Sequence, residues 1–461
     1  MGEKRTNESM KNAGPITPRR LGSEASTLLS AHRVLVICQR RKTVKFLGKN
    51  LAVIALCLGL ASVGRAQTAP APPTPATPAT GQAATPPAAA AAPSAPAALP
   101  TPAITGPLAG IPPLVFDAGP VGKLSVNGIV SGFGMAQTNN IATDSDGQAT
   151  LSNGQVWIQK TDGWFQFYVQ AGAYDLPALA TPFANAQSTV TNFYGPVPTA
   201  YVKLQAGKTT SILIGELPTL IGAEYTFTFE NMNIERGLLW DQENAINRGI
   251  QLNQSVGKYL TASFSWNDGF YSNRYTWLSG SLTYTKGPHA LSFVAGGNAH
   301  SKSAFQSPVT PVQNTGSIYN VIYTYTKGAW IVQPYFQYTD VPTNVSIGIV
   351  NGASTRGGAI LVSRAFKHGF SLAARGEYIG STGSTAQQSV NLIFGPGSSG
   401  ISITGTPTFQ YGGFFVRGDL SYVDARSFAP GSGFGIAGTN GNQFRAVGEI
   451  GFMFGDNIVK K

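Results

Sequence analysis

Charged residues are scarce in this chain of 461 residues, and their scarcity excludes most soluble classes. Asp, Glu, Lys and Arg together make up 11% of the residues, against roughly 25% in a typical soluble domain. Mean hydropathy is +0.00, which argues against a bundle of membrane-spanning helices, since each such helix needs about 20 mostly apolar residues. The composition therefore fits neither an ordinary soluble enzyme nor a helical membrane protein.

Cysteine is almost absent and histidine is rare. Cys38 and Cys57 both precede the signal-peptide cleavage site predicted below, so the mature chain would contain no cysteine. This excludes disulfides, thiolate zinc sites and cysteine catalysis. None of the four histidines has metal-ligand spacing, and His300 beside Ser301 is the one pair that a membrane-embedded hydrolase could use. We therefore expect no metal, no cofactor and no enzymatic activity.

The formal net charge of +11 comes almost entirely from the N-terminal leader. Residues 1–66 contain 12 Lys and Arg against 3 Asp and Glu, whereas the remainder is nearly balanced. Because the rest of the chain carries almost no excess positive charge, its electrostatics do not favour a nucleic-acid partner.

The leader has the order of segments that is typical of a secretory signal peptide. It consists of basic residues 40–49, then the apolar run 51–64, then a small-residue cleavage site at Ala66. A membrane anchor is the alternative, but the apolar run is shorter than a span.

Residues 67–113 are rich in proline and alanine and carry no charge. They include 14 Pro and 16 Ala, a composition that favours extended chain and cannot form a core. We predict a disordered periplasmic linker. It is either a plain spacer or a segment that contacts the cell wall or a periplasmic partner.

The hydrophobic pattern of residues 123–454 has a period of two, which is typical of strands. In residues 443–454, for example, Phe444 alternates with Arg445 and Glu449. Sixteen such segments begin near residues 123, 153, 164, 198, 210, 246, 259, 276, 289, 317, 329, 356, 370, 399, 414 and 442. Their connectors alternate between short and long, which is the connectivity of outer-membrane barrels. Residues 114–461 are therefore predicted to be all-β, a closed antiparallel transmembrane β-barrel of 16 strands with short periplasmic turns and long outer loops.

Four short runs between residues 210 and 270 add a family resemblance. They read GELPT from Gly215, GAE from Gly222, NIERGLL from Asn233 and NRGI from Asn247. The chain here resembles the OmpL-like β-barrel porin family of bacterial outer membranes and, more distantly, general porins. The resemblance implies a barrel in outer-membrane lipid that passes small hydrophilic solutes and ions, with its third long loop folded into the pore. It also implies a homotrimer.

Charge placement gives candidates for the pore itself. Acidic residues concentrate in the third long loop, residues 218–245, and the candidates for the constriction are Glu224, Glu230, Glu235, Arg236, Asp241 and Glu243. The charged residues expected to face the lumen from the strands are Lys203, Arg375, Glu377, Arg417, Asp419, Arg445 and Glu449. Opposed charges across a narrow lumen would make the pore prefer ions of one sign. Because water and dissolved salt screen charges in the lumen, this preference would be mild and would weaken as the salt concentration rises. Alternatively, the loop acids lie on the cell surface, or the paired charges neutralise one another.

The sequence thus predicts an exported outer-membrane porin that allows passive diffusion. The alternative is a non-conducting structural or anchoring barrel, tied to the cell wall by residues 67–113. The polar inward positions do not decide between them.

Overall fold

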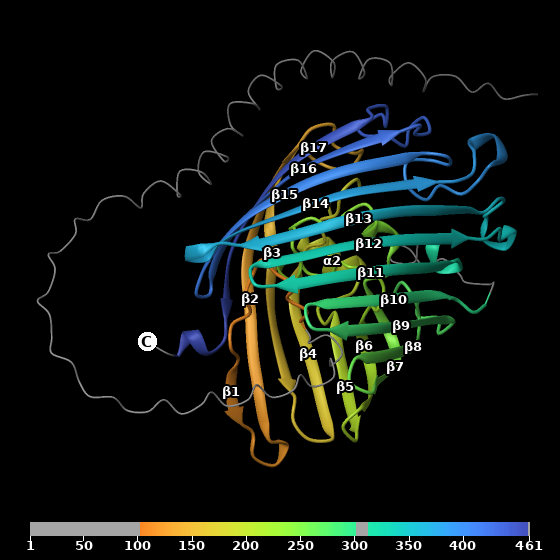
Figure 1. The fold of residues 1–461 in the computed structure, drawn as a ribbon. Helices are drawn as coiled ribbons and strands as arrows, with labels where there is room; N and C mark the ends of the chain where they lie inside the picture. The colour runs from red at the N-terminus through yellow and green to blue at the C-terminus, as the bar shows by residue number, and fades with distance from the viewer. Residues whose placement is uncertain (1–101, 301–311, 460–461) are drawn as a thin grey trace, which may run out of the picture. The chain divides into compact units, whose positions relative to one another are not determined.

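Residues 102–300 and 312–459, the part of the chain that the computed structural model describes, form an antiparallel β-barrel. Each strand pairs with its neighbour in the sequence, and β17 pairs with β2 to close the barrel (Figure 1). The predicted signal peptide and residues 67–101 of the predicted linker lie outside the described residues. No helix of the described ranges has both the length and the hydropathy to cross a membrane.

The sixteen barrel strands are β2 (Lys123–Gln137), β3 (Gly147–Lys160), β4 (Phe165–Tyr174), β5 (Thr199–Ala206), β6 (Thr210–Pro218), β7 (Ile246–Val256), β8 (Leu260–Asn267), β9 (Trp277–Lys286), β10 (His289–Asn298), β11 (Ser317–Lys327), β12 (Trp330–Val341), β13 (Ala353–Ala365), β14 (Phe370–Ser381), β15 (Ser399–Tyr411), β16 (Phe414–Arg426) and β17 (Asn442–Phe454). One α-helix, α2 (Ala186–Asn192), lies in the connector between β4 and β5. The predicted closed barrel of 16 strands is confirmed.

Two strand boundaries differ from the sequence prediction. β3 begins at Gly147, not near residue 153, because its first residues are small or polar and show no apolar alternation. It pairs with β2 across a register shift between Ser131 and Gly132. A short additional strand, β1 (Leu114–Asp117), pairs with the first residues of β2, beyond the point where β17 ends.

The two faces of the sheet are reversed relative to a soluble protein. On β17, Phe444 is 41% exposed and Ile450 is 51% exposed, whereas Arg445 and Glu449 point inward and are each 1% exposed. An exposed apolar face and an enclosed polar face are expected of a barrel whose outer surface meets lipid. The sequence alternation therefore sorts the strand residues as predicted.

Long connectors leave one end of the barrel and short turns leave the other. Two long connectors fold back inside. The first is residues 219–245 between β6 and β7, here called the inner loop, and the second is the part of the β4–β5 connector around Ala178. A parallel bridge between Ala178 and Arg236 joins them.

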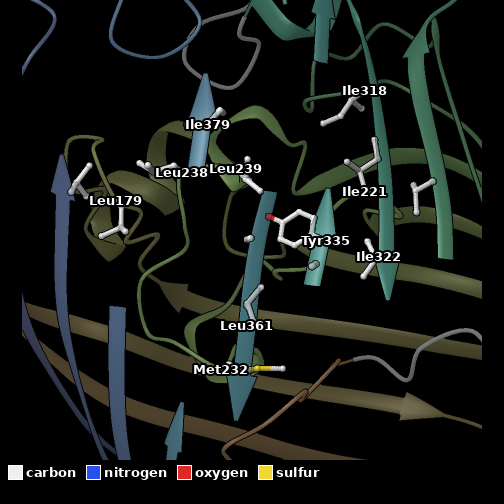
Figure 2. Close-up of a cluster of buried hydrophobic side chains, with 14 of the residues drawn as sticks. Leu179, Ile221, Met232, Leu238, Leu239, Ile318, Ile322, Tyr335, Leu361 and Ile379 are labelled. Atoms are coloured by element: carbon white, nitrogen blue, oxygen red, sulfur yellow. The ribbon is translucent and has the colours of Figure 1, made fainter. Parts of the chain in front are cut away.

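An apolar cluster fixes the inner loop against the barrel wall. Ile221, Met232, Leu238 and Leu239 of the inner loop belong to the same buried cluster as side chains of β10 to β14 (Figure 2). The strand members labelled in Figure 2 are Ile318, Ile322, Tyr335, Leu361 and Ile379. The burial of these side chains removes apolar area from water, which favours the folded loop.

A substitution at Gly172 tests how closely β4 approaches β3. Its φ is +145°, and a Cβ at this position would lie 2.0 Å from the carbonyl oxygen of Gly154. We expect Gly172→Ala to destabilise the barrel by about 1–3 kcal/mol, since backbone has to move. The measurement is the urea midpoint in detergent micelles.

The matched control is Gly134→Ala on β2, where a Cβ would meet nothing within 4 Å. Equal midpoints for the two variants would contradict the β3–β4 geometry.

Candidate functional site

Three inward arginines on one side of the barrel reach the inner loop. Arg375 lies on β14, Arg417 on β16 and Arg445 on β17. Each is 1% exposed. They are called the arginine row below. A buried guanidinium is stable only where its charge and its N–H donors find partners, so the partners of this row define the site.

Arg417 holds the main chain of the inner loop. Its Nη1 donates to the carbonyl oxygen of Thr228 at 2.9 Å, and its Nη2 donates to that of Asn231 at 3.0 Å and to that of Met232 at 3.3 Å. Carbonyl groups in a turn would otherwise need water. Arg417 therefore fixes the path of the backbone at the centre of the loop.

Arg375 joins the wall to a loop carboxylate. Its Nη1 lies 2.6 Å from Glu224 Oε1 and also donates to the carbonyl oxygen of Glu235 at 2.6 Å. Its Nε lies 3.2 Å from Glu377 Oε2 on the same strand. All these groups are almost fully buried, so the attraction is little screened by solvent.

Arg445 ties both folded-back connectors to β17. Its Nη1 lies 3.0 Å from Glu235 Oε1 and 2.6 Å from the carbonyl oxygen of Ala178. Its Nη2 donates to the carbonyl oxygen of Thr181 at 2.8 Å. The inner loop and the β4–β5 connector thus share one charged anchor.

Wall carboxylates complete the network by accepting from the loop backbone and side chains. Asp419 Oδ2 accepts from the amide of Glu235 at 2.8 Å, and Glu377 Oε2 accepts from the amide of Leu238 at 3.1 Å. Glu449 Oε1 accepts from Thr228 Oγ1 at 3.0 Å. Charge-assisted bonds of this kind are stronger than neutral ones, and they run in both directions between wall and loop.

The structure buries most of the predicted site residues inside the barrel. The members that are at most 7% exposed are Glu224, Glu230, Glu235, Arg236, Glu243, Arg375, Glu377, Arg417, Asp419, Arg445 and Glu449. Asp241 and Lys203 are the two that remain partly exposed. Of the acids of the inner loop, Glu224 and Glu235 therefore contact wall arginines directly rather than facing them across water.

Burial perturbs the charged groups of the loop. Loss of solvent raises the pKa of Glu230 to about 7, against the backbone hydrogen bonds from Phe227 and Ala103. Burial also lowers the pKa of Arg236 to about 10, although Asp175 and Glu224 lie near it. In both groups, the effect of burial on the pKa is larger than the opposing effect of the hydrogen bonds and charges nearby. The loop is held by its position in the barrel, at an electrostatic cost.

A second part of the inward face carries uncharged polar groups. Towards the short-turn end, β8 to β12 present partly exposed hydroxyl and amide side chains: Ser263, Ser281, Thr283, Ser292, Thr324 and Gln333. Lys203 on β5 adds one positive charge to the inward face. It lies two residues from Tyr201, which pairs with the inward-facing Tyr168 of β4. These groups, rather than the arginine row, are the ones that water reaches.

Several residues of the site carry no signal in the sequence pattern. Gly222 has a φ of +85°, and a Cβ there would lie 1.7 Å from Glu243 Oε2. Thr228 and Thr181 contribute through positions that only the folded loops bring to the arginines. Gly222 begins one of the family-like runs, which is the only hint the sequence offers.

No group of three or more His, Cys, Asp or Glu residues in the described ranges could hold a metal ion. The site is thus built from ion pairs and hydrogen bonds between protein groups.

Comparison with known protein families finds a match that covers most of the chain. A family model described as "Putative beta-barrel porin-2, OmpL-like" matches residues 123–454. No curated protein sequence matches the chain.

Solved structures with a similar fold include three outer-membrane proteins. OmpT of Vibrio cholerae, folded in vitro, is 11% identical, with a TM-score of 0.48 over 72% of this chain and 97% of its own. The outer membrane channel DcaP of Acinetobacter baumannii is 10% identical, with a TM-score of 0.48 over 75% and 100%. OmpF of Salmonella typhi, in complex with daunomycin, is 13% identical, with a TM-score of 0.47 over 72% and 98%. Similarities of this size concern the fold alone.

The ion pairs of the arginine row predict a large stability effect. Arg375→Ala would leave Glu224 and Glu377 buried without their cation, which we expect to destabilise the folded barrel by about 3–5 kcal/mol. The measurement is the free energy of unfolding in detergent, together with protease cleavage within residues 219–245.

Arg426→Ala is the matched control. Arg426 pairs with Asp424 at 2.8 Å, but its side chain is 62% exposed, so we expect an effect of at most about 1 kcal/mol. If both variants lose the same stability, the buried pairs do not hold the loop.

Proposed function

The chain belongs to the OmpL-like β-barrel porin family, and on this premise we propose that it is an outer-membrane porin. Small hydrophilic solutes and ions diffuse passively through its barrel, and the inner loop forms the constriction. The short turns face the periplasm and the long connectors face outward. The assembly we propose is the homotrimer of general porins. The protein performs no chemistry.

The observation that carries this proposal is a polar inward face combined with a connector anchored inside a closed barrel. A loop that only covered the outer surface would not need a row of buried arginines on the wall. Its carbonyl groups would be solvated by water instead of by Arg417. An internal loop narrows a barrel that is otherwise wide enough for solutes, and barrels of this strand number can enclose an aqueous channel.

The buried charges and the exposed charges have different roles in this proposal. The arginine row and its carboxylates position the inner loop and have little contact with passing ions. The partly exposed Lys203 and Asp241, together with the hydroxyl and amide groups of β8 to β12, contact the solute path. Ion preference then depends on few charges in a wet environment and is mild.

Single-channel recording of the refolded mature chain in a planar bilayer tests the porin role. We expect discrete open steps, and a finite reversal potential under a salt gradient. A folded barrel that inserts but never conducts would refute the porin role.

Lys203→Glu tests which charges the ions meet. Two unit charges about 10 Å apart in water interact by roughly 0.4 kcal/mol. Reversing the charge changes the energy of a passing cation by twice that, about 0.8 kcal/mol, so the cation permeability should rise about four-fold at low salt and less at high salt. The readout is the reversal potential.

Lys258→Glu, the same charge change in the turn between β7 and β8, should leave the reversal potential unchanged. Identical reversal potentials for Lys203→Glu and the parent would place Lys203 outside the solute path.

A non-conducting anchoring barrel is the second candidate, and one observation favours it. At the level of the inner loop, the buried apolar cluster and the buried ion pairs extend from β10 to β17. Such packing leaves little room for water beside them. In this role, the Pro/Ala-rich segment would tie the barrel to the cell wall.

Deletion of residues 67–101 separates the two roles in cells. A porin should keep its solute uptake, whereas an anchor should lose its effect on envelope integrity, measured as detergent sensitivity and vesicle release. The deletion stops at 101 because the residues that follow contact the barrel.

A further inference from the structure

Residues 102–112, at the end of the segment predicted to be an unstructured linker, run inside the barrel. This differs from the sequence prediction, in which the linker extends to residue 113. We propose that residues 102–112, here called the strap, close the short-turn end of the barrel and hold the inner loop in place. The strap is a built-in gate whose release opens the pore. This inference rests on the proposed porin function.

The strap enters at the seam of the barrel. The amide of Asp456, just after β17, donates to the carbonyl oxygen of Pro112 at 2.9 Å. Asn127 Nδ2 at the start of β2 donates to the carbonyl oxygen of Ile111 at 2.8 Å. These bonds fix the strap beside the closing strands, where β1 also begins.

The strap then crosses the mouth of the barrel. The amide of Ala109 donates to Gln410 Oε1 at 2.7 Å, and Gln410 Nε2 donates back to the carbonyl oxygen of Ala109 at 2.9 Å. Gln410 lies next to the turn between β15 and β16. Further along, a Cβ on Gly106 would lie 3.4 Å from Ile331 Cδ1 of β12. Contacts with strands as far apart as β2 and β12 mean that the strap runs across the barrel.

Leu108 anchors the strap by apolar contact. Its side chain is 4% exposed and belongs to a buried cluster inside the barrel. The inward-facing wall residues of this cluster include Ile129, Trp157, Tyr168, Phe415 and Met453. Burial of a leucine side chain contributes about 1.5–3 kcal/mol, which adds to the hydrogen bonds that hold the strap.

The N-terminal end of the strap binds the inner loop. The amide of Ala103 donates to Glu230 Oε1 at 3.0 Å, and Thr105 Oγ1 donates to the carbonyl oxygen of Glu230 at 2.7 Å. The neighbouring Phe229 stacks on Trp157 of β3 at 5.6 Å between ring centroids. The strap, residues 229 and 230 of the inner loop, and β3 of the barrel wall are therefore in contact with one another here.

The strap is more easily released than the inner loop. It has no charged side chain, and hydrogen bonds and apolar contacts hold it. The inner loop, by contrast, is held by buried ion pairs from Arg375 and Arg445 and by hydrogen bonds from Arg417. Loss of the strap would uncover the inward face at the short-turn end and remove two partners of Glu230, while the arginine row would keep the loop attached. The uncharged contact should also be insensitive to salt.

Leu108→Asp tests the strap in the full-length chain, since a buried carboxylate would expel the segment from its apolar cluster. We expect the channel to be open for a several-fold larger fraction of the recording time. Gly110→Asp is the matched control, because Gly110 is exposed and a Cβ there would meet only Ile104 Cδ1 at 3.5 Å, so this variant adds the same charge two residues away without entering the apolar cluster. Its channel should be open for the same fraction of time as that of the parent.

The outcomes separate the strap from the porin function. If the parent conducts and Leu108→Asp conducts equally, the strap is not a gate, and the porin function stands. If neither the parent nor the variant conducts, both the proposed function and the gate are wrong.

A reversible crosslink tests the same point without disturbing the core. Ala109→Cys with Gln410→Cys can be bridged by a short bis-methanethiosulfonate, and the mature chain offers no other cysteine if the leader is removed as predicted. We expect the bridge to suppress openings and dithiothreitol to restore them. Unchanged openings in the bridged protein would overturn the proposal.

Discussion

The interior of this barrel depends on the burial of three arginines. A guanidinium enclosed at 1% exposure must find carboxylates or carbonyl groups, and Arg375, Arg417 and Arg445 find most of theirs on connectors that fold back from the long-connector end. Each connector in turn has backbone groups that need donors once water is excluded. Wall and loop therefore satisfy each other, and neither arrangement is stable without the other.

This mutual dependence divides the inward face into a fixed part and an accessible part. The arginine row lies on β14, β16 and β17, beside the inner loop, whereas β8 to β12 carry neutral hydroxyl and amide groups that water reaches. At the short-turn end the strap runs from the seam beside β2 to Ile331 of β12, at the edge of the second part. In the proposed porin, passage is thus controlled by two elements, of which the charged one is firmly held and the uncharged one is easily released.

The barrel could be predicted from the sequence because the alternation of outward apolar and inward polar residues is visible within each strand. A period of two with apolar residues outward fixed the strand positions, and only β3 and β1 escaped, since small and polar residues show no alternation. The charged residues of the site could be named for the same reason, but their contacts could not. Whether Arg445 faces water or Glu235 depends on where a loop of 27 residues, 219–245, folds. The strap was missed because its Pro and Ala composition is typical of a linker, and its large apolar residues, Ile104, Leu108 and Ile111, show no strand or helix period.

Hydrogen exchange of the backbone amides in the detergent-solubilised barrel tests whether the inner loop is anchored to the wall. We expect the amides of Glu235, Gly237 and Leu238, which donate to Asp419, Glu224 and Glu377, to exchange as slowly as those of the barrel strands. The exposed β12–β13 connector, residues 342–352, serves as the fast reference. Exchange of the inner-loop amides at the rate of that connector would show that the loop is not anchored, and would contradict the account.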